Sequence, residues 1–342
     1  MGRVDAAAAL GRIAFLLERQ NASTYRVRAF RRAAETVQAA GPEEIRGRAA
    51  EGTLTALPDI GATTATVIAE CAAGGTPEYL ERLEAETWFG ADADGGPVGR
   101  QLRGDLHTHS DWSDGGSSIE LMAVTARALG RDYIALTDHS PRLTVANGLT
   151  AQRLREQIAV VAELNERLAP FRILTGIEVD ILEDGSLDQS ADLLAAVDVV
   201  VASVHSKLRM EREAMTRRMV RAVNDPNTDV LGHCTGRMRT GGRTRPESAF
   251  DSTVVFEACL RAGVAVEVNS RPERLDPPRR LLAEAVDVGC LLAVDTDAHA
   301  PGQLAWSVVG CARAAAVGAA PESVVTTWGL DALSRWTGRH GS

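Results

Sequence analysis

Most of the chain, from about residue 102 onward, alternates short apolar runs with amphipathic helical patterns. Seven apolar runs are expected to form strands, over 104–107, 133–137, 172–178, 199–204, 230–232, 264–268 and 291–294. Helical patterns separate most of them, over 118–129, 151–168, 211–224, 250–262 and 278–288. This alternation constrains the fold strongly, because it is typical of parallel strands joined by helices. We therefore predict an α/β fold with a parallel sheet or barrel over 102–342.

Residues 1–86 have a different pattern and predict a small all-helical domain. Leu10, Ile13 and Leu17 lie on one side of a first helical pattern, and Ser23 precedes a second one that is rich in arginine. A third helix is expected over 62–72. Residues 90–99 are small, acidic and rich in glycine, which indicates a linker over 87–101 between the two domains.

Composition excludes several classes of protein. The 342 residues carry Lys+Arg 37 against Asp+Glu 46, a net charge of -9, which argues against a chain coated in basic surface but allows a local basic patch. The five cysteines are odd in number and widely spaced, so neither a disulfide framework nor a zinc finger is expected. Neither a long apolar run nor a signal-peptide layout is present, so we expect a cytoplasmic protein without membrane contact.

Histidines and carboxylates gather at the ends of the expected strands. Six of the seven histidines follow strands, and His340 in the tail is the exception. The six are His107, His109, His139, His205, His233 and His299, and the carboxylates among them are Asp105, Asp114, Asp138, Glu178, Asp295 and Asp297. A lone histidine at a strand end usually only donates or accepts a hydrogen bond. Six that share one face of a barrel favour a metal site of zinc, manganese or iron.

The motifs that carry these residues resemble one family. GDLHTHSDWSDG, ALTDHS, GIEVDILEDGSLD, ASVHS, LGHCTGR, EVNSRPERLD and DTDAHA look like the successive motifs of the PHP (polymerase and histidinol phosphatase) superfamily. The match is closest to the C-terminal PHP domain of bacterial family X DNA polymerases. The resemblance implies a distorted seven-stranded β/α barrel, similar to a TIM barrel, and agrees with the strand count made from the pattern alone.

The resemblance also implies nine ligands for three divalent metal ions, which would be manganese, zinc or iron. The first ion would take His107, His109, Glu178 and Asp297; the second would share Glu178 and add His205 and His233; the third would take Asp114, His139 and His299. The implied reaction is phosphoester hydrolysis by a metal-activated hydroxide. Asp297, Glu178 and His205 would be catalytic, together with Lys207, the chain's only lysine.

Arginines near these motifs are candidates to bind substrate phosphate. They are Arg237, Arg239, Arg243 and Arg245 in a glycine-rich loop after His233, and Arg271 and Arg274 after the sixth strand. Guanidinium groups bind phosphate in a bidentate manner, although a solvated loop would show the same composition. Cys234 would point away from His233 on a strand, so packing is expected of it rather than metal binding.

The N-terminal domain resembles the helix-hairpin-helix domain that opens family X polymerases, through TYRVRAFRRAAETV and LPDIGATTATVIAE. The resemblance implies DNA contacts by Arg26, Arg31, Gly61 and Thr63, since backbone N–H groups at the start of the second hairpin helix can hold a phosphate. A helical bundle with surface arginines, or a protein-docking domain, is the alternative.

Two departures from that family exclude activities. Val67 stands where the lyase relatives have a Schiff-base lysine, and Thr63 stands where they have a phosphate-binding lysine. Only about fifteen residues separate the two domains, which leaves no room for a polymerase palm. The chain is therefore expected to be neither a polymerase nor a Schiff-base lyase.

Three functions remain open from the sequence. The first is a DNA phosphoesterase that acts on 3′ ends, gaps or abasic sites, as a 3′–5′ exonuclease, a 3′-end-processing enzyme or an abasic-site endonuclease. The second is a small-molecule phosphatase of the histidinol-phosphate type. The third is a non-catalytic scaffold for repair factors, which the intact ligand set disfavours. The oligomeric state does not follow from the sequence.

Overall fold

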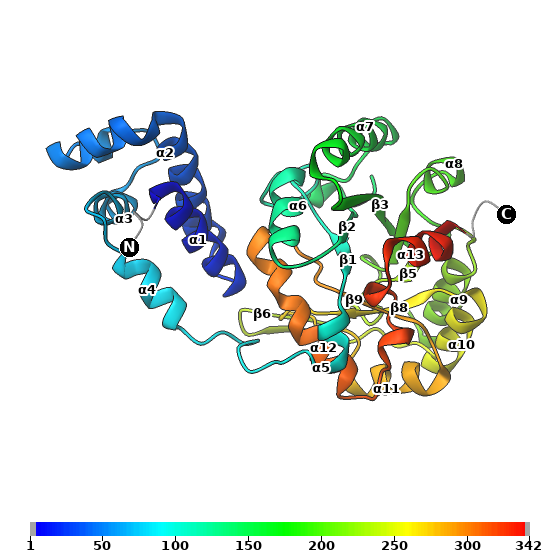
Figure 1. Cartoon of the computed structure of the whole chain (residues 1–342). Helices are drawn as coiled ribbons and strands as arrows, with labels where there is room; N and C mark the ends of the chain where they lie inside the picture. Colours follow the sequence, from blue (N-terminus) through cyan, green and yellow to red (C-terminus); the bar gives the residue numbers. More distant parts are fainter. Residues whose placement is uncertain (1–4, 339–342) are drawn as a thin grey trace. The chain divides into compact units, whose positions relative to one another are not determined.

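The computed structural model describes residues 5–338 and divides into two units between Ala91 and Asp92 (Figure 1). This division falls inside the segment 87–101 that the sequence predicts as a linker. The end of that segment differs from the prediction, because Gly96–Gln101 forms helix α5 and belongs to the second unit. Val98 is wholly buried there, so apolar packing orders a stretch whose composition is typical of a flexible linker.

The first unit is all helical, as predicted. It contains α1 (Ala6–Arg19), α2 (Thr24–Glu51), the short 3₁₀ turn η1 (Leu54–Ala56), α3 (Ala62–Ala72) and α4 (Glu78–Ala85). Asp5 caps α1, since its Oδ1 accepts a hydrogen bond from Ala8 N at 2.8 Å. A buried apolar core that includes Leu10, Ile13, Phe30 and Ile68 joins the helices.

The second unit is built around seven parallel strands. They are β1 (Gly104–Thr108), β2 (Tyr133–Leu136), β3 (Arg172–Asp180), β4 (Val199–Ser203), β5 (Val230–Leu231), β8 (Ala265–Asn269) and β9 (Leu292–Asp295). They pair in this order. Each of the seven predicted strands is thus present, and the fold is a nearly closed β/α barrel, as the sequence predicts.

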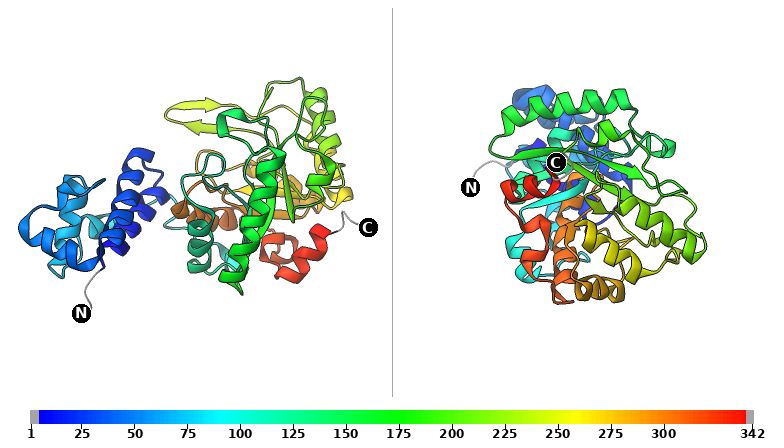
Figure 2. Two further views of the ribbon diagram at one scale, coloured as in Figure 1. Left: turned by 90° about the horizontal axis from the view of Figure 1, so that it is seen from above. Right: turned by 90° about the vertical axis from the view of Figure 1, so that its right-hand side faces the viewer.

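Helices surround the strands of this unit, as two directions of view show (Figure 2). Those that follow predicted patterns are α6 (Ile119–Ala128), α7 (Ala151–Leu168), α9 (Arg212–Val223), α10 (Ser252–Ala262) and α11 (Arg279–Val288). The chain also forms α8 (Ala191–Leu194), α12 (Ser307–Ala315), α13 (Leu330–Thr337) and the 3₁₀ turns Thr144–Ala146, Pro301–Trp306, Pro321–Ser323 and Val325–Thr327. Within the described residues, no helix is long and apolar enough to cross a bilayer.

Alternation along each strand separates an apolar end of the barrel from a polar end. On β3, Leu174 and Glu178 lie on the same side of the strand, because side chains repeat every second residue. Leu174 belongs to an apolar cluster with Val201 and with Leu333 of α13, whereas Glu178 lies at the carboxyl end. The same order holds on β9, where apolar Ala293 precedes Asp295. Polar side chains therefore concentrate at the carboxyl ends of the strands.

A short β-hairpin in the second unit was also not predicted. The glycine-rich segment after β5 forms an antiparallel hairpin of β6 (Met238–Thr240) and β7 (Arg243–Arg245), drawn in yellow-green in Figure 2. Gly241 and Gly242 form its turn with φ of 53° and 80°, a left-handed pair that favours a two-residue hairpin loop. Each strand has only three residues, so the periodic signal in the sequence is too short to reveal it.

Candidate metal centre

All nine predicted ligands lie together at the carboxyl ends of the strands. His107 is on β1 and Glu178 on β3, whereas the other seven stand in loops that follow strands. His109 and Asp114 follow β1, His139 follows β2, His205 follows β4, His233 follows β5, and Asp297 and His299 follow β9. Because parallel strands end at one face of the barrel, residues almost 200 positions apart in the chain become neighbours.

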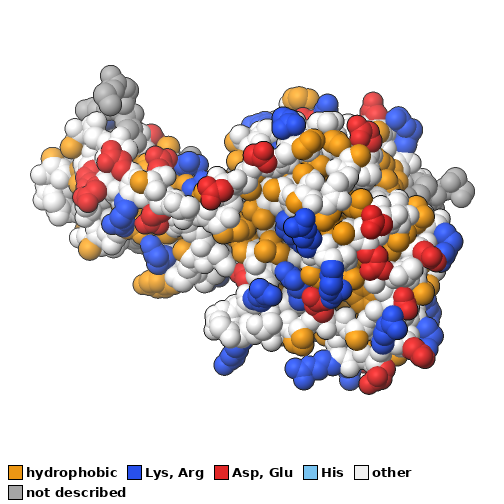
Figure 3. All heavy atoms as spheres, turned by 90° about the horizontal axis from the view of Figure 1, so that it is seen from below, with side chains coloured by type: hydrophobic (Ala, Val, Ile, Leu, Met, Phe, Trp, Pro, Cys, Tyr) orange, Lys and Arg blue, Asp and Glu red, His pale blue; other side chains and the backbone are white. Residues whose placement is uncertain are grey.

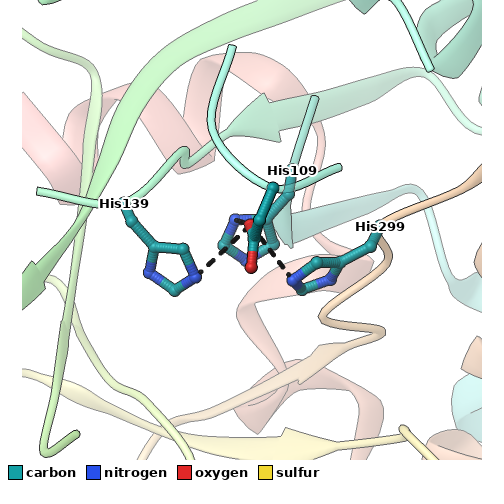
Figure 4. Close-up of side chains that lie close together, drawn as sticks. His109, His139 and His299 are labelled. Carbon is teal, nitrogen blue, oxygen red and sulfur yellow. Dashed lines mark ion pairs between the residues drawn. The ribbon is translucent and has the colours of Figure 1, made fainter. Parts of the chain in front are cut away.

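Three imidazoles surround the carboxylate of Asp114 (Figure 4). Its Oδ1 lies 3.4 Å from His299 Nε2, 3.6 Å from His139 Nε2 and 3.9 Å from His109 Nδ1. Figure 4 shows the three rings turned toward one another from different loops. This is the third ligand set that the family resemblance implies, with His109 added.

Glu178 is buried and lies among five of the six histidines. Its Oε2 is 2.8 Å from His139 Nδ1 and 3.7 Å from His109 Nε2. Its Oε1 faces three Nε2 atoms, at 3.3 Å from His107, 3.3 Å from His205 and 2.9 Å from His233. A carboxylate that meets five imidazoles through both oxygens has the position expected of a bridge between metal ions.

Asp297, in the loop after β9, completes the centre. Its Oδ1 lies 3.5 Å from His109 Nε2, and its Oδ2 accepts a hydrogen bond from Arg274 Nε at 2.9 Å. The backbone of Asp297 has a φ of 53°, a left-handed conformation that is uncommon outside glycine. Strain of this kind persists where neighbouring contacts hold a side chain in a particular direction, as in functional sites.

A second layer of groups that the sequence analysis did not single out orients the imidazoles. Glu267 Oε1 lies 2.6 Å from His107 Nδ1, and Asp180 contacts His205 Nδ1. His299 Nδ1 faces the carbonyl oxygen of Asp297 at 2.9 Å. Because each contact takes the Nδ1 atom, the Nε2 atoms of His107, His205 and His299 are left to face the centre.

The sequence contains a signal for these two carboxylates. Asp180 stands two residues after Glu178 on β3, and Glu267 stands two residues before the buried Asn269 on β8. Each pair therefore points to one side of its strand. Acidic residues on a strand are rare in apolar barrels, and a buried one needs a partner.

Unpaired buried atoms test whether metal ions fit here. His107 Nε2, both ring nitrogens of His109, His205 Nε2 and Glu178 Oε2 are buried and make no hydrogen bond. Such groups are costly inside a protein unless something coordinates them. Imidazole nitrogens and carboxylate oxygens without thiolates are a donor set for zinc, manganese or iron. The residues therefore fit divalent metal ions.

The described residues form four groups whose ligand atoms all lie within 4.8 Å of one another. The groups are His109 with Asp114, His139 and His299; His107 with His109 and Asp297; His107 with Glu178 and His233; and His139 with Glu178 and His205. The first group contains the implied third set together with His109, and the second contains the implied first set without Glu178. Glu178, His205 and His233 do not form a group of their own, although both histidines contact the same Glu178 oxygen.

Electrostatics keep several of these groups in a form that binds metal. Burial, followed by the charges of His299 and His139, lowers the pKa of His109 to about 3, so its ring is neutral. Burial by itself would raise the pKa of Glu178, but His107, His205 and His139 outweigh it and hold that pKa well below its usual range. Despite burial, Glu178 and Asp114 raise the pKa of His139 to about 10, so a metal ion there has to displace a proton.

Comparison with known proteins assigns both units. Residues 1–77 match the family described as helix-hairpin-helix domain, and residues 105–271 match the family described as PHP domain. The second unit is a PHP domain. This agrees with the family resemblance seen in the sequence motifs.

Two relatives of this chain have different named activities. A Bacillus subtilis protein named DNA polymerase/3′-5′ exonuclease PolX is 42% identical over 199 residues, which cover 58% of this chain and 34% of that protein. The match thus spans about a third of that relative's length. A protein of Thermoanaerobacter pseudethanolicus named probable phosphatase is 28% identical over 206 residues, 57% of this chain and 78% of that protein.

A solved structure of histidinol phosphate phosphatase from Lactococcus lactis, complexed with zinc, L-histidinol and phosphate, is also similar. It has 18% sequence identity and a TM-score of 0.43, and the similarity covers 62% of this chain and 94% of that chain.

The arginines that follow the sixth strand of the PHP domain lie on Asp297 rather than in open solvent. Arg274 is buried, and its pKa is raised because Asp297 and Glu178 outweigh the effect of burial. Arg271 Nη1 lies 3.4 Å from Asp297 Oδ1 and 3.1 Å from His299 Nδ1. Both side chains contact predicted ligands, and their roles toward substrate stay predictions.

Lys207 and the arginines of the hairpin have varied surroundings. Lys207 is exposed, with its ammonium 3.8 Å from Glu183. Arg237 Nε donates to Arg274 O, and Arg245 Nε donates to Gly236 O, each at 2.6 Å. The side chains of Arg239 and Arg243 are exposed on β6 and β7. No contact between these five residues and the predicted metal ligands is seen, so their roles toward substrate stay predictions.

Candidate DNA contacts in the helix-hairpin-helix domain fall into two kinds. Gly61 and Thr63 are exposed at the start of α3, where the Gly61 N–H donates to Thr64 Oγ1 at 3.0 Å. Arg26 is exposed and donates to Tyr79 OH at 2.8 Å. Arg31 instead forms a two-bond ion pair with the buried Glu18, at 3.0 and 2.7 Å.

Val67, which stands where the lyase relatives have a lysine, lies in the core of its domain. Val67 is only 1% exposed and belongs to the apolar core of the helix-hairpin-helix domain. A lysine at this position would have to be buried, so the core of this domain is packed for an apolar residue.

Proposed function

We propose that this protein hydrolyses phosphoester bonds of DNA at the carboxyl face of the PHP barrel, with three divalent metal ions held by the nine residues described above. The observation that carries the proposal is the convergence of six histidines and three carboxylates, among which five histidines and Glu178 have buried ring nitrogens or a carboxylate oxygen without a hydrogen-bond partner. Manganese, zinc and iron all suit this donor set.

The PHP match and the metal-binding cluster support hydrolysis of phosphoesters. When bound, divalent ions would neutralise phosphate oxygens and activate water. The chain itself supplies rigid positioning. Glu267 and Asp180 fix the rings of His107 and His205, and Arg274 holds the carboxylate of Asp297. Arg271 is partly exposed beside His299, where its guanidinium could also reach a substrate phosphate.

Two observations favour DNA as the substrate. The PHP domain is joined to a helix-hairpin-helix domain, and a relative named DNA polymerase/3′-5′ exonuclease PolX is 42% identical over 199 residues. The net charge of -9 favours a small substrate over DNA, so DNA binding requires a local basic patch. On the face shown in Figure 3, blue and red side chains are interspersed, so the acidic excess forms no continuous surface there. We propose that DNA ends, gaps or abasic sites are the targets.

A small-molecule phosphatase of the histidinol-phosphate type is the second candidate. It is supported by relatives named probable phosphatases, of which the one from Thermoanaerobacter pseudethanolicus matches over 78% of its own length. A metal centre of this kind contacts the phosphoester, which both substrates share.

A parallel assay on purified protein with Mn²⁺ tests the two candidates. One arm follows shortening of end-labelled single-stranded, gapped and abasic DNA, and the other follows phosphate release from histidinol phosphate. Asp297→Ala removes a predicted ligand, and Asp331→Ala, at an exposed acid on α13, is the matched control.

Cleavage of DNA by the wild type and by Asp331→Ala, with its loss in Asp297→Ala, is the expected result. Phosphate release from histidinol phosphate with the DNA left intact would contradict the proposal and support the second candidate.

A further inference from the structure

A surface groove of the PHP domain is lined by segments that follow the predicted ligands His205 and His233 along the chain. It has a volume of about 590 Å³ and is lined by residues 208–212, which begin three positions after His205, and by 245–247 and Ala249, which follow the hairpin. The two walls meet at the foot of the hairpin, where a Cβ added to Gly236 would lie 2.6 Å from Leu208 Cδ2. The groove therefore starts within a few residues of two predicted ligands, His205 and His233.

The groove combines apolar surface with unpaired positive charge. Leu208, Met210 and Pro246 provide the apolar part. Arg212 is neutralised by Asp251 at 2.8 Å, and Glu247 is neutralised by Arg280. Among the described residues, no carboxylate lies within ion-pair distance of Arg209 or Arg245. Glu211 also lines the groove and likewise has no cationic partner within the described part of the chain. Cations that lack acidic partners are available to a ligand's anions.

The hairpin extends this positive surface. Residues 237–245 contain four arginines and no acid, in a chain whose net charge is -9. Arg239 pairs across the hairpin with Thr244, and Arg243 pairs with Thr240, so the two arginines occupy opposite faces. Both are exposed, and neither has an acidic partner in the part of the chain that the structure describes.

Contacts at the base fix the hairpin relative to the metal centre. Arg239 N donates to Glu273 O at 2.8 Å, and Arg237 Nε donates to Arg274 O at 2.6 Å. Arg274 in turn donates to the predicted ligand Asp297 at 2.9 Å. The hairpin that carries the exposed guanidinium groups is thus connected to the predicted ligand Asp297 through two successive hydrogen bonds.

We propose that the groove and the hairpin bind a single DNA strand whose end lies at the metal centre. This inference rests on the proposed function, and it names the form of DNA that the site holds. Arg209, Arg239, Arg243 and Arg245 contact backbone phosphates at separate points along the strand, and the apolar surface of Leu208, Met210 and Pro246 contacts sugars and bases. A small phosphate ester would fill the metal centre alone and leave all of this surface unused.

The double variant R239Q/R243Q tests the proposal in the full-length protein with Mn²⁺. The matched control is R127Q/R155Q, which removes two exposed arginines from α6 and α7. The substrates are labelled thymidine oligonucleotides of about twelve and about two nucleotides, because only the longer one reaches the hairpin. The measured quantities are KM, kcat and the dependence of kcat/KM on salt concentration.

For the longer strand, R239Q/R243Q is expected to raise KM about tenfold with kcat nearly unchanged. The slope of log kcat/KM against log salt concentration should become shallower by about 1.4, since each lost phosphate contact on a single strand contributes about 0.7. The dinucleotide kinetics should match those of the wild type, and the control variant should behave as wild type on both substrates.

Equal KM values and salt slopes for wild type and R239Q/R243Q on the longer strand would overturn this inference while leaving the proposed function intact. A wild-type protein that shortens neither oligonucleotide but releases phosphate from histidinol phosphate would overturn the proposed function and this inference with it.

Discussion

The carboxylate of Asp295 accepts a hydrogen bond from the backbone N–H of Leu106, with 2.7 Å between Leu106 N and Asp295 Oδ1. This bond joins β9 to β1, the last strand of the barrel to the first. Next to it, Thr296 Oγ1 donates to the carboxylate of Asp105, and His109 N donates to Ala298 O at 2.8 Å. Side-chain carboxylates thus replace part of the backbone ladder where the barrel closes.

The closure of the barrel at Asp295 predicts a pH-dependent stability. Burial, followed by the charges of Asp105 and Glu267, raises the pKa of Asp295 well above its usual range. A carboxyl group whose pKa is higher in the folded state contributes stability that is fully present below its unfolded pKa and is lost as pH rises through the folded pKa. Asp295→Asn keeps an acceptor for Leu106 N and cannot ionise.

Urea unfolding, followed by the fluorescence of the buried Trp306, measures this effect between about pH 5.5 and about pH 8.5. As pH rises over that range, the wild type is expected to lose about 1–2 kcal/mol more of its free energy of unfolding than Asp295→Asn does. If the free energy of unfolding changes with pH equally in the two proteins, this prediction is wrong. Asp331→Asn, on the exposed surface of α13, is the control.

Replacing Glu267 should weaken metal binding without unfolding the protein. Glu267 is wholly buried, contacts His107 Nδ1 at 2.6 Å and accepts a hydrogen bond from the His233 N–H. Glu267→Gln preserves size and one acceptor but loses the charge that orients the His107 ring. We expect an affinity for Mn²⁺ that is about 10–100-fold lower, measured by calorimetric titration.

Glu257→Gln, at a surface ion pair with Arg261 on α10, is the control for this variant. Its metal affinity should equal that of the wild type. An unchanged Mn²⁺ affinity in Glu267→Gln would show that the ring of His107 is held by other contacts.

Removal of metal should destabilise the PHP domain. Without ions, the imidazoles of His107, His109 and His205 keep buried nitrogens that have no partner. Ions at about a hundred times their dissociation constant would add about 2.7 kcal/mol to the free energy of unfolding. Chelation is therefore expected to lower the Tm by roughly 5–10 °C, and Mn²⁺ or Zn²⁺ should restore it. Calorimetry that gives the same Tm with and without chelator would argue against a metal centre.

Arg31 should matter more for the stability of the helix-hairpin-helix domain than Arg26. Glu18 is buried, and Arg31 neutralises it through two hydrogen bonds. Arg31→Gln removes two charge-assisted hydrogen bonds from a buried carboxylate, which costs about 3 kcal/mol in the free energy of unfolding. Arg26→Gln removes only a surface contact with Tyr79, with an effect below about 0.5 kcal/mol.

Thermal unfolding of the two variants side by side provides the measurement. If Arg31→Gln unfolds at the same temperature as Arg26→Gln, the ion pair with Glu18 contributes nothing, and Arg31 is free to serve DNA instead.

The sequence by itself determined the seven strands of the barrel and the location of the candidate site. Each strand is a short apolar run, and the signal for it lies within the run itself. His107, His139 and His205 could be grouped from sequence because strands of a parallel barrel end on one face, so a position after a strand already implies neighbours. The all-helical character of the first unit followed in the same way from the local spacing of residues such as Leu10 and Ile13.

Only the tertiary structure decided which side chains pair. Glu267 contacts His107 across 160 positions of the chain, and Arg274 donates a hydrogen bond to Asp297. Arg31 lies on the buried Glu18, and residues 96–101 form a packed helix within a glycine-rich segment. These contacts depend on the distance and direction between side chains on separate elements. Local periodicity carries no information about either, because it specifies which face of an element is buried and not what that face meets.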